Sequence, residues 1–309
     1  MNTPKFSVIV PVYNAFETLA STVASVLNQS DHDWEMILID DGSTDRSLRL
    51  MLDFAAKDDR IRAISQSNAG PSAARNLGAQ LARGEFLAFL DADDLWTEKK
   101  LVEHREFHDT FLGVDASFAQ IEFLETAANG DCVVRTLSTV PSGALCLAQI
   151  VGENPVCTTS NLVVRAAAFA ELGGFSVGMD YAEDQEFVAR YVDKGHLILG
   201  IDHKLVSYRM MESGLSADLA AMLNGWRALA STYAERIDVE AMEAVYCRYL
   251  ARRALRTGAR PKIAIDYMIA GLQLNAAAFL ADRRRGIMTI LATLLSPTMP
   301  RPLRRRVFA

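Results

Sequence analysis

The chain has 309 residues, of which 50% are hydrophobic and 23% are charged, and its formal net charge at pH 7 is −6. This composition excludes a disordered or fibrous protein, and the negative charge argues against bulk binding of nucleic acid. No run reaches the roughly 20 apolar residues that a membrane-spanning helix needs. The N-terminus lacks the basic segment and cleavage site of a secretory signal, so we expect a cytoplasmic protein. The four cysteines show no metal-ligand spacing, and we expect them to be reduced and buried.

The first third of the chain alternates short apolar runs with amphipathic segments, which predicts βαβ units around a largely parallel sheet. Strands are expected at 6–12, 35–39, 61–65 and 86–90, and helices at 16–28, 45–57 and 71–82. Asn14 followed by Glu17 resembles a capping box at the start of the first helix. Farther along, the pattern predicts a hairpin over 117–137, a helix over 180–193 and a helical region from about 216 onward.

Polar residues follow several of these strands, namely Tyr13, Asp41, Asn68 and the acidic run 91–94. Open α/β sheets bind ligands at the carboxyl ends of their strands, so we expect these residues to share one crevice. The clustered carboxylates would repel one another, and a hard cation that also contacts a phosphate would relieve this repulsion. The alternative is a solvated acidic turn that caps a helix over 95–104.

Five segments carry a resemblance to a known family: VIVPVYN, LIDDGSTD, NAGPSAARN, FLAFLDADDLW and AEDQEF. In order and approximate spacing they resemble family 2 glycosyltransferases over residues 5–212. The resemblance implies the α/β fold called GT-A, with a mostly parallel central sheet, in a catalytic domain over 1–215. Its nucleotide-sugar-binding half would cover about 1–95 and its acceptor half about 96–215. A helical C-terminal region with a basic end would follow over 216–309.

Carried over by position, the resemblance implies that Pro11 and Tyr13 line the nucleobase pocket. The alternative for Tyr13 is a packing aromatic at a strand end. Asp41 would accept a hydrogen bond from the base, which suits the imide of uracil or thymine, while Asp40 would be a turn former.

Asn68, Gly70 and Arg75 would approach the nucleotide, with Gly70 giving backbone room and Arg75 a cation for phosphate. The alternative for Arg75 is an ion pair with an aspartate at the sheet end. Arg209 would neutralise charge on the departing diphosphate. Many relatives have a His two residues after this Arg, and Met211 stands there instead, so metal ligation by this segment is not expected.

The family pattern makes Asp93 the ligand of a divalent cation, Mg²⁺ or Mn²⁺, and Asp91 a second metal or ribose contact. Asp94 would support these acids or cap the following helix. Trp96 would border the acceptor site or pack beneath the loop.

Glycosyl transfer requires neutralisation of the departing diphosphate and deprotonation of the acceptor hydroxyl from the opposite face of the sugar. The resemblance gives the second task to Asp184 as catalytic base, and Glu183 would orient the acceptor or Asp184. A single displacement inverts the anomeric configuration. Taken alone, these two acids would only stabilise a helix start.

The C-terminal region combines the apolar stretch 287–295 with arginines at positions 283–285, 301 and 304–306. This pattern predicts peripheral association with the inner face of the cell membrane, and the alternative is a solvated basic tail beside a docked helix.

We therefore expect an enzyme that transfers a sugar from a nucleoside diphosphate sugar, with UDP- or dTDP-sugars favoured, to a hydroxyl on a glycan, lipid carrier or protein. Synthesis of a bacterial polysaccharide or glycoconjugate would be its context. The alternative is a catalytically silent nucleotide-sugar-binding or scaffold protein. A nucleotidyltransferase is disfavoured because VPVYNAFE lacks the Gly-rich basic loop expected after its first strand.

Overall fold

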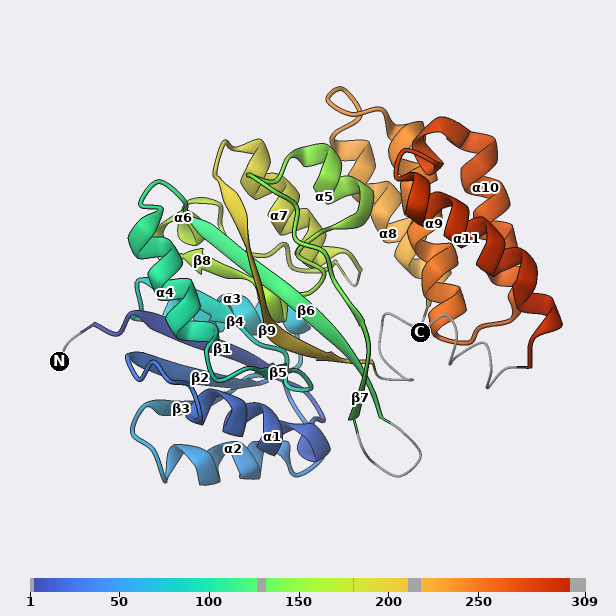
Figure 1. The fold of residues 1–309 in the computed structure, drawn as a ribbon. Coiled ribbons are helices and arrows are strands. Elements are labelled where there is room, and N and C mark those ends of the chain that lie inside the picture. Colours follow the sequence, from blue (N-terminus) through green and yellow to red (C-terminus); the bar gives the residue numbers. More distant parts are fainter. Residues whose placement is uncertain (1–2, 127–131, 180, 211–217, 301–309) are drawn as a thin grey trace. The chain divides into compact units, whose positions relative to one another are not determined.

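The computed structural model describes residues 3–126, 132–179, 181–210 and 218–300, and the chain divides into two compact units (Figure 1). The first unit comprises Met1–Leu145 and Pro155–Met210, and the second comprises Cys146–Asn154 and Met211–Ala309. The segment Cys146–Asn154 therefore groups with the C-terminal helices, although its sequence position lies within the predicted catalytic domain.

The first unit is built on a sheet that has nine strands within the described residues, in the order β3-β2-β1-β4-β8-β6-β9-β5, with β7 paired to β6. Its strands are β1 Phe6–Val12, β2 Trp34–Asp40, β3 Ile61–Ser65, β4 Phe86–Phe89, β5 Leu95–Trp96, β6 Ala116–Thr126, β7 Cys132–Leu137, β8 Val163–Arg165 and β9 Ile198–Arg209. Strands β3, β2, β1 and β4 are parallel, β6 is parallel to β9, and the other pairs are antiparallel.

The helices of the first unit are α1 Phe16–Leu27, α2 Ser47–Ala55, α3 Pro71–Leu81, α4 Lys100–Thr110, α6 Ala166–Glu171 and α7 Glu183–Asp193, with the 3₁₀ turn η1 Thr159–Asn161. The predicted strands at 6–12 and 61–65 coincide with β1 and β3. The predicted helices at 16–28, 45–57 and 71–82 are confirmed as α1, α2 and α3, with ends that differ by at most two residues. Hydrophobic periodicity is therefore sufficient to locate these elements.

Helices cover both faces of the parallel strands. Successive side chains of a strand point to opposite faces of its sheet. Val10 and Leu38 share a core with Val23 of α1, whereas Ile39 packs with Ala74 of α3 in a separate core. Because both faces are covered, the edge formed by the strand ends is the place left for a polar site.

Strand register brings the carboxyl ends of β1, β2 and β4 together. Val12 pairs with Asp40 of β2, and Ile9 pairs with Phe89 of β4. The loops that begin at residues 13, 41 and 90 therefore leave the sheet at the same edge, as the sequence predicts.

Two local predictions are wrong. Asn14 and Glu17 do not form a capping box, since the residue before α1 is Ala15, and the backbone N–H of Phe16, the first residue of the helix, donates to Asp45 Oδ2 at 3.1 Å instead. Asn14 has a φ of 49°, and its side-chain oxygen accepts hydrogen bonds from the backbone N–H groups of Thr44 (2.8 Å) and Asp45 (3.3 Å). The helix expected over 95–104 begins only at Lys100, because residues 95 and 96 pair with β9 instead.

The second unit is helical, with α5 Leu147–Glu153, α8 Leu219–Thr232, α9 Val239–Arg256, α10 Pro261–Phe279, α11 Arg283–Leu295 and the 3₁₀ turn η3 Ser296–Thr298. Glu153 at the end of α5 binds both Arg248 of α9 (2.9 Å) and Arg285 of α11 (2.7 Å). Trp226 of α8 donates to the carbonyl oxygen of Val151 at 2.6 Å. These contacts attach α5 to helices that lie far from it in sequence.

The expectation that the cysteines are buried is wrong in part. Cys146, Cys157 and Cys247 are free thiols, but only Cys247 is buried. In the parts of the chain that the structure describes, no helix combines the length and hydrophobicity required to cross a bilayer. The basic positions 301 and 304–306 of the predicted membrane-binding region lie outside the described residues.

Candidate active site

The acidic turn after β4 places its three carboxylates in different environments. Asp94 is fully buried, and its carboxylate accepts hydrogen bonds from the Ser160 hydroxyl (2.6 Å) and from the backbone N–H of Arg209 (3.1 Å). Asp94 is therefore no helix cap, and it ties β9 to the turn. Asp91 and Asp93 are partly exposed. A bound ligand could reach these two carboxylates, whereas Asp94 holds the turn in place.

Burial, together with neighbouring negative charge, disfavours the charged forms of Asp93 and Asp94. Burial and the neighbouring charge of Asp91 raise the pKa of Asp93 to about 6. Burial, followed by the charges of Asp93 and Asp91, raises the pKa of Asp94 well above its ordinary value. A cation placed beside Asp93 would reverse this effect.

The acids suit a hard cation by their chemistry, although they do not form a complete cage. Among the described residues, no group of three or more His, Cys, Asp or Glu side chains is preassembled to hold a metal. Asp93 makes no ion pair with a described residue, whereas Asp91 is already paired with Arg75. Mg²⁺ typically takes one or two protein carboxylates and completes its shell with substrate phosphates and water. The residues present therefore fit a cation that arrives with, or is completed by, a diphosphate.

Arg75 joins the acidic turn to the second acidic motif. This arginine is 4% exposed, and its guanidinium binds Asp91 at 2.6 Å and Glu183 at 3.2 Å. The ion-pair alternative for Arg75 is therefore the one that the structure shows. Its Nε has no hydrogen-bond partner within the described residues. Arg75 holds two carboxylates that lie 92 positions apart in sequence close to one another.

Asp184 lies in the first turn of α7, next to the Arg75 ion pairs. Ala182, which precedes the helix, has left-handed backbone angles (φ 62°), and one carboxylate oxygen of Asp184 accepts from the backbone N–H of Gln185 at 2.7 Å. Burial and the charge of Glu183 raise the pKa of Asp184 to about 7, while the charge of Arg75 lowers it. A carboxylate with such a pKa is suited to proton transfer near neutral pH.

The predicted nucleobase residues lie at the ends of β1 and β2. The Tyr13 side chain is 54% exposed, which makes it available for stacking rather than a packing aromatic. Asp41 is buried, and its carboxylate accepts from Gln66 Nε2 (2.7 Å) and from the backbone N–H groups of Ala69 and Gly70 (both 2.9 Å). A carboxylate has about four acceptor sites, so Asp41 retains capacity for one further donor.

Hydrogen bonds to Asp41 also hold the loop after β3 in place. Asn68 Nδ2 donates to the carbonyl oxygen of Asp41 at 2.9 Å, and Gly70 has a φ of 89° that other residues rarely adopt. Pro11 lies in β1 and is half-buried. Asp40 accepts from the backbone N–H of Ser43 at 3.1 Å, as expected of a turn former.

The sequence predicts Trp96 at the acceptor site or beneath the loop, and Arg209 at the departing diphosphate. Trp96 is 4% exposed, and its indole N–H donates to the carbonyl oxygen of Ser160 at 2.9 Å. It therefore packs beneath the acidic turn, which is one of the two roles expected for it, and its contact with the acceptor stays a prediction. Arg209 donates from Nη2 to Ser21 at 2.6 Å and from its backbone N–H to Asp94 at 3.1 Å, which places it beside the acidic turn. Met211 lies outside the described residues.

The η1 turn was not predicted from the sequence, and hydroxyl groups in and next to this turn form hydrogen bonds with the acidic motif. Ser160 accepts from the backbone N–H of Asp91 (3.0 Å) while it donates to Asp94, and the Thr158 hydroxyl donates to Asp91 at 3.4 Å. Because β8 runs antiparallel to β4, the residues that precede β8 lie where β4 ends. The polar run Thr158–Thr159–Ser160–Asn161 directly before an apolar strand was the available signal.

Comparisons with known proteins agree with this arrangement. Residues 7–172, more than half of the chain, match the family described as "Glycosyl transferase family 2". The putative teichuronic acid biosynthesis glycosyltransferase TuaG of Bacillus subtilis is 28% identical over 251 residues, which cover 79% of this chain and 93% of that protein. An uncharacterized glycosyltransferase of Haemophilus influenzae is 38% identical over 141 residues, or 42% of this chain. That match spans only 56% of the relative's own length.

A solved structure shows the same fold. S. aureus TarS 1–349 in complex with UDP-GlcNAc superimposes with a TM-score of 0.62 at 20% sequence identity, and the match covers 95% of this chain and 91% of that one. The fold is thus the predicted α/β GT-A fold. The ordered motifs, their convergence at one sheet edge and the match over residues 7–172 together show that the chain belongs to glycosyl transferase family 2.

Proposed function

We propose that this protein transfers a sugar from a nucleoside diphosphate sugar to a hydroxyl acceptor with inversion of the anomeric configuration. The observation that carries the proposal is the pair of ion bonds from Arg75 to Asp91 and Glu183. They join Asp91, in the acidic turn suited to a metal diphosphate, to Glu183, which directly precedes Asp184, the carboxylate suited to deprotonation of an acceptor. Such proximity is required when the leaving group and the attacking hydroxyl act on one anomeric carbon.

The donor would lie along the ends of β1, β2 and β4. The exposed ring of Tyr13 and the remaining acceptor site of Asp41 suit a uracil or thymine base, so UDP- and dTDP-sugars are favoured. TarS has been solved with UDP-GlcNAc and with UDP, which supports a uridine nucleotide for this fold. Asn68 and Gly70 shape the loop beside the nucleotide.

A divalent cation, Mg²⁺ or Mn²⁺, would be held by Asp93 with Asp91 as a second contact, and it would supply positive charge to the diphosphate when bound. Asp94 and Ser160 hold the turn in position, and Arg209 adds a cation near Asp93. These side chains together would stabilise the negative charge that develops on the leaving group.

Asp184 would accept the acceptor proton as the hydroxyl oxygen forms its bond to the anomeric carbon. The bond from that carbon to the diphosphate oxygen breaks, and the diphosphate leaves with the electron pair. Because the pKa of Asp184 is about 7, much of this carboxyl group is ionised at neutral pH. Glu183 is held by Arg75 and would orient the acceptor.

The acceptor would be a glycan, a lipid-linked sugar or a protein hydroxyl, and a role in bacterial polysaccharide synthesis agrees with the teichuronic acid biosynthesis for which TuaG is named. The test begins with a screen of UDP- and dTDP-sugars for thermal stabilisation, with and without Mn²⁺. The stabilising donor is then incubated with candidate acceptors, and nucleoside diphosphate release and product configuration are measured. Release of a nucleoside diphosphate with an inverted product supports the proposal. Donor binding without turnover on any acceptor would favour the catalytically silent binding protein. Release of pyrophosphate would favour a nucleotidyltransferase.

A further inference from the structure

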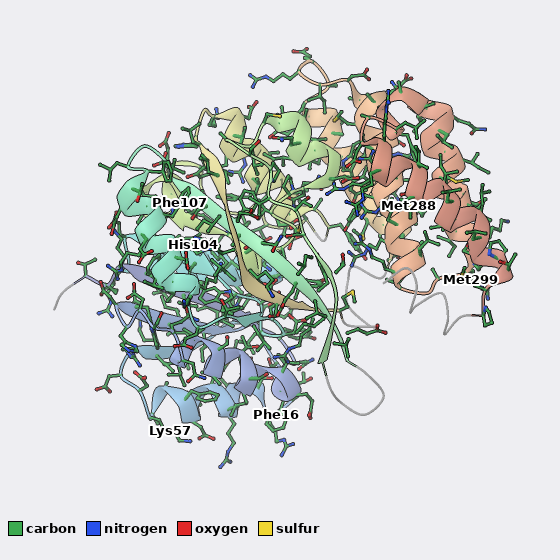
Figure 2. The ribbon with its side chains drawn as sticks, in the orientation of Figure 1. Phe16, Lys57, His104, Phe107, Met288 and Met299 are labelled. Atoms are coloured by element: carbon green, nitrogen blue, oxygen red, sulfur yellow. The ribbon has the colours of Figure 1, made fainter. Side chains whose placement is uncertain are left out.

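Helix α11 presents large apolar side chains to solvent. Five of them expose between 49% and 58% of their surface: Ile287, Met288, Leu291, Leu294 and Leu295. At 3.6 residues per turn, all five fall within an arc of roughly 120°. We call this arc the α11 apolar face, and Met288 on it is labelled in Figure 2. Single exposed apolar residues are ordinary on a protein surface, but a continuous face of five requires an explanation.

The side of α11 opposite this face is the one that packs against the rest of the second unit. The residues that α11 buries are small or polar, namely Gly286, Thr289 and Thr293. A side chain at Gly286 would lie 2.9 Å from the carbonyl oxygen of Phe279, so the helix packs closely through its small residues. The helix therefore turns its polar side inward and its apolar side outward. This is the reverse of a helix that is amphipathic for its own core.

Cations flank the apolar face. Arg283 and Arg284 are exposed in the first turn of α11. Arg284 falls within the arc of the apolar side chains and Arg283 about 20° beyond its edge, whereas Arg285 turns inward to Glu153. The sequence of α11 contains no acidic residue. Beside the face lies a hollow of about 660 Å³ lined by Ala277, Leu280, Ala281, Arg283 and Ile287. An apolar hollow with one guanidinium suits an acyl chain next to a phosphate.

We propose that the α11 apolar face binds the surface of an anionic phospholipid membrane. Apolar side chains would enter the interface, and Arg283 and Arg284 would contact headgroup phosphates, as in helices that lie flat on bilayers. Charge argues against a second copy of the chain. A two-fold contact through this face would bring Arg283 and Arg284 of both copies to the interface, and α11 offers no acid to pair with them.

The test is sedimentation of the full chain with vesicles of phosphatidylcholine alone, or with about a quarter phosphatidylglycerol. Wild type should sediment with the anionic vesicles, and less so when the salt rises from about 0.1 M to about 0.5 M. Arg283→Gln/Arg284→Gln should bind on the order of 30-fold more weakly. Met288→Gln/Leu291→Gln/Leu295→Gln should bind on the order of 100-fold more weakly.

The matched control is Leu52→Gln/Leu112→Gln/Leu197→Gln, which replaces three exposed leucines of the first unit and should bind like wild type. Circular dichroism establishes that each variant is folded. The proposal is overturned if wild type does not sediment, or if the α11 variants bind as well as wild type. It is equally overturned if Arg304→Gln/Arg305→Gln/Arg306→Gln alone abolishes binding while the α11 variants retain it. Analytical ultracentrifugation covers the remaining case: a wild-type dimer that the triple α11 variant converts to a monomer, with unchanged vesicle binding, would assign the face to self-association.

Discussion

The hydroxyl of Ser160 lies 2.6 Å from Oδ2 of the buried Asp94 and donates a hydrogen bond to it. The hydroxyl oxygen of Ser160 also accepts a hydrogen bond from the backbone N–H of Asp91 at 3.0 Å. One serine from a turn 66 positions farther along the chain therefore holds both ends of the acidic motif. Ser160 touches neither donor nor acceptor in the proposed mechanism, and we regard it as a positioning residue.

Ser160→Ala should leave the Asp94 carboxylate and the Asp91 N–H each short of a partner. We expect the free energy of unfolding to fall by about 1–3 kcal/mol, as is usual for buried groups that lose a hydrogen bond. Turnover should fall by about 10- to 100-fold, because supporting residues orient the groups that bind metal and substrate. Ser117→Ala is the matched control, since Ser117 is also fully buried but bonds His104 and His108. An equal loss of turnover in the control would assign the effect to general destabilisation.

Arg75 is the second residue whose role depends on two partners. Arg75→Met should destabilise the fold by about 3–5 kcal/mol, because two poorly solvated carboxylates lose their cation. Arg75→Lys keeps the charge but cannot form the same forked pair of bonds, so it should recover only part of this stability. Denaturant unfolding of both variants measures the difference. Equal stability of the Met and Lys variants would contradict an electrostatic role.

Asp93 should control binding of the donor through the cation. Asp93→Ala, or addition of a chelator to wild type, should weaken UDP or dTDP binding in calorimetry. Because the pKa of Asp93 is about 6, protons compete with the metal below that value, and metal-dependent affinity should fall as the pH drops from about 7 to about 5. Unchanged affinity with chelator, or in Asp93→Ala, would count against the metal assignment.

The sequence predicts local elements and the edge of the sheet where they converge. Strand β1 and helix α3 follow from periodicity, and the acidic turn from its place after an apolar strand. The bond between Arg75 and Glu183 spans 108 positions, and tertiary packing alone creates it. Local propensity likewise misplaced the helix after Trp96, because pairing with β9 takes precedence over helix formation there.

Lys100 offers a prediction about stability that is independent of catalysis. It is fully buried on α4, with Nζ 3.1 Å from Nε2 of His104 and no carboxylate partner among the described residues (Figure 2 labels His104). Burial lowers the pKa of Lys100 from 10.5 to about 7. Between these two pH values the unfolded chain binds the additional proton, so stability rises with pH. Below about pH 7 the lysine is charged in both states, and the whole cost of burying its charge is present.

Lys100→Met removes this titration. The free energy of unfolding of the variant minus that of wild type should be most positive at about pH 6 and should decrease toward pH 10. Denaturant unfolding at several pH values measures the difference. The control is Lys99→Met, which replaces the exposed lysine next to Lys100. A difference that does not change with pH would show that Lys100 is solvated in solution.

Asp184→Asn tests the proposed base by activity and by stability. The variant keeps the shape of the side chain but cannot accept the proton, so turnover should fall by roughly 10²- to 10⁴-fold while donor affinity persists. In wild type, kcat/KM should rise with pH through about 7, because only the ionised carboxylate is active. The folded pKa is raised from 3.8, so the folded state holds the additional proton between about pH 4 and pH 7 and wild type loses stability across that range. Asp184→Asn should therefore become more stable relative to wild type as the pH rises through the same range. Near-normal transfer by the variant, or a product that retains the donor configuration, would rule out Asp184 as the base of an inverting reaction.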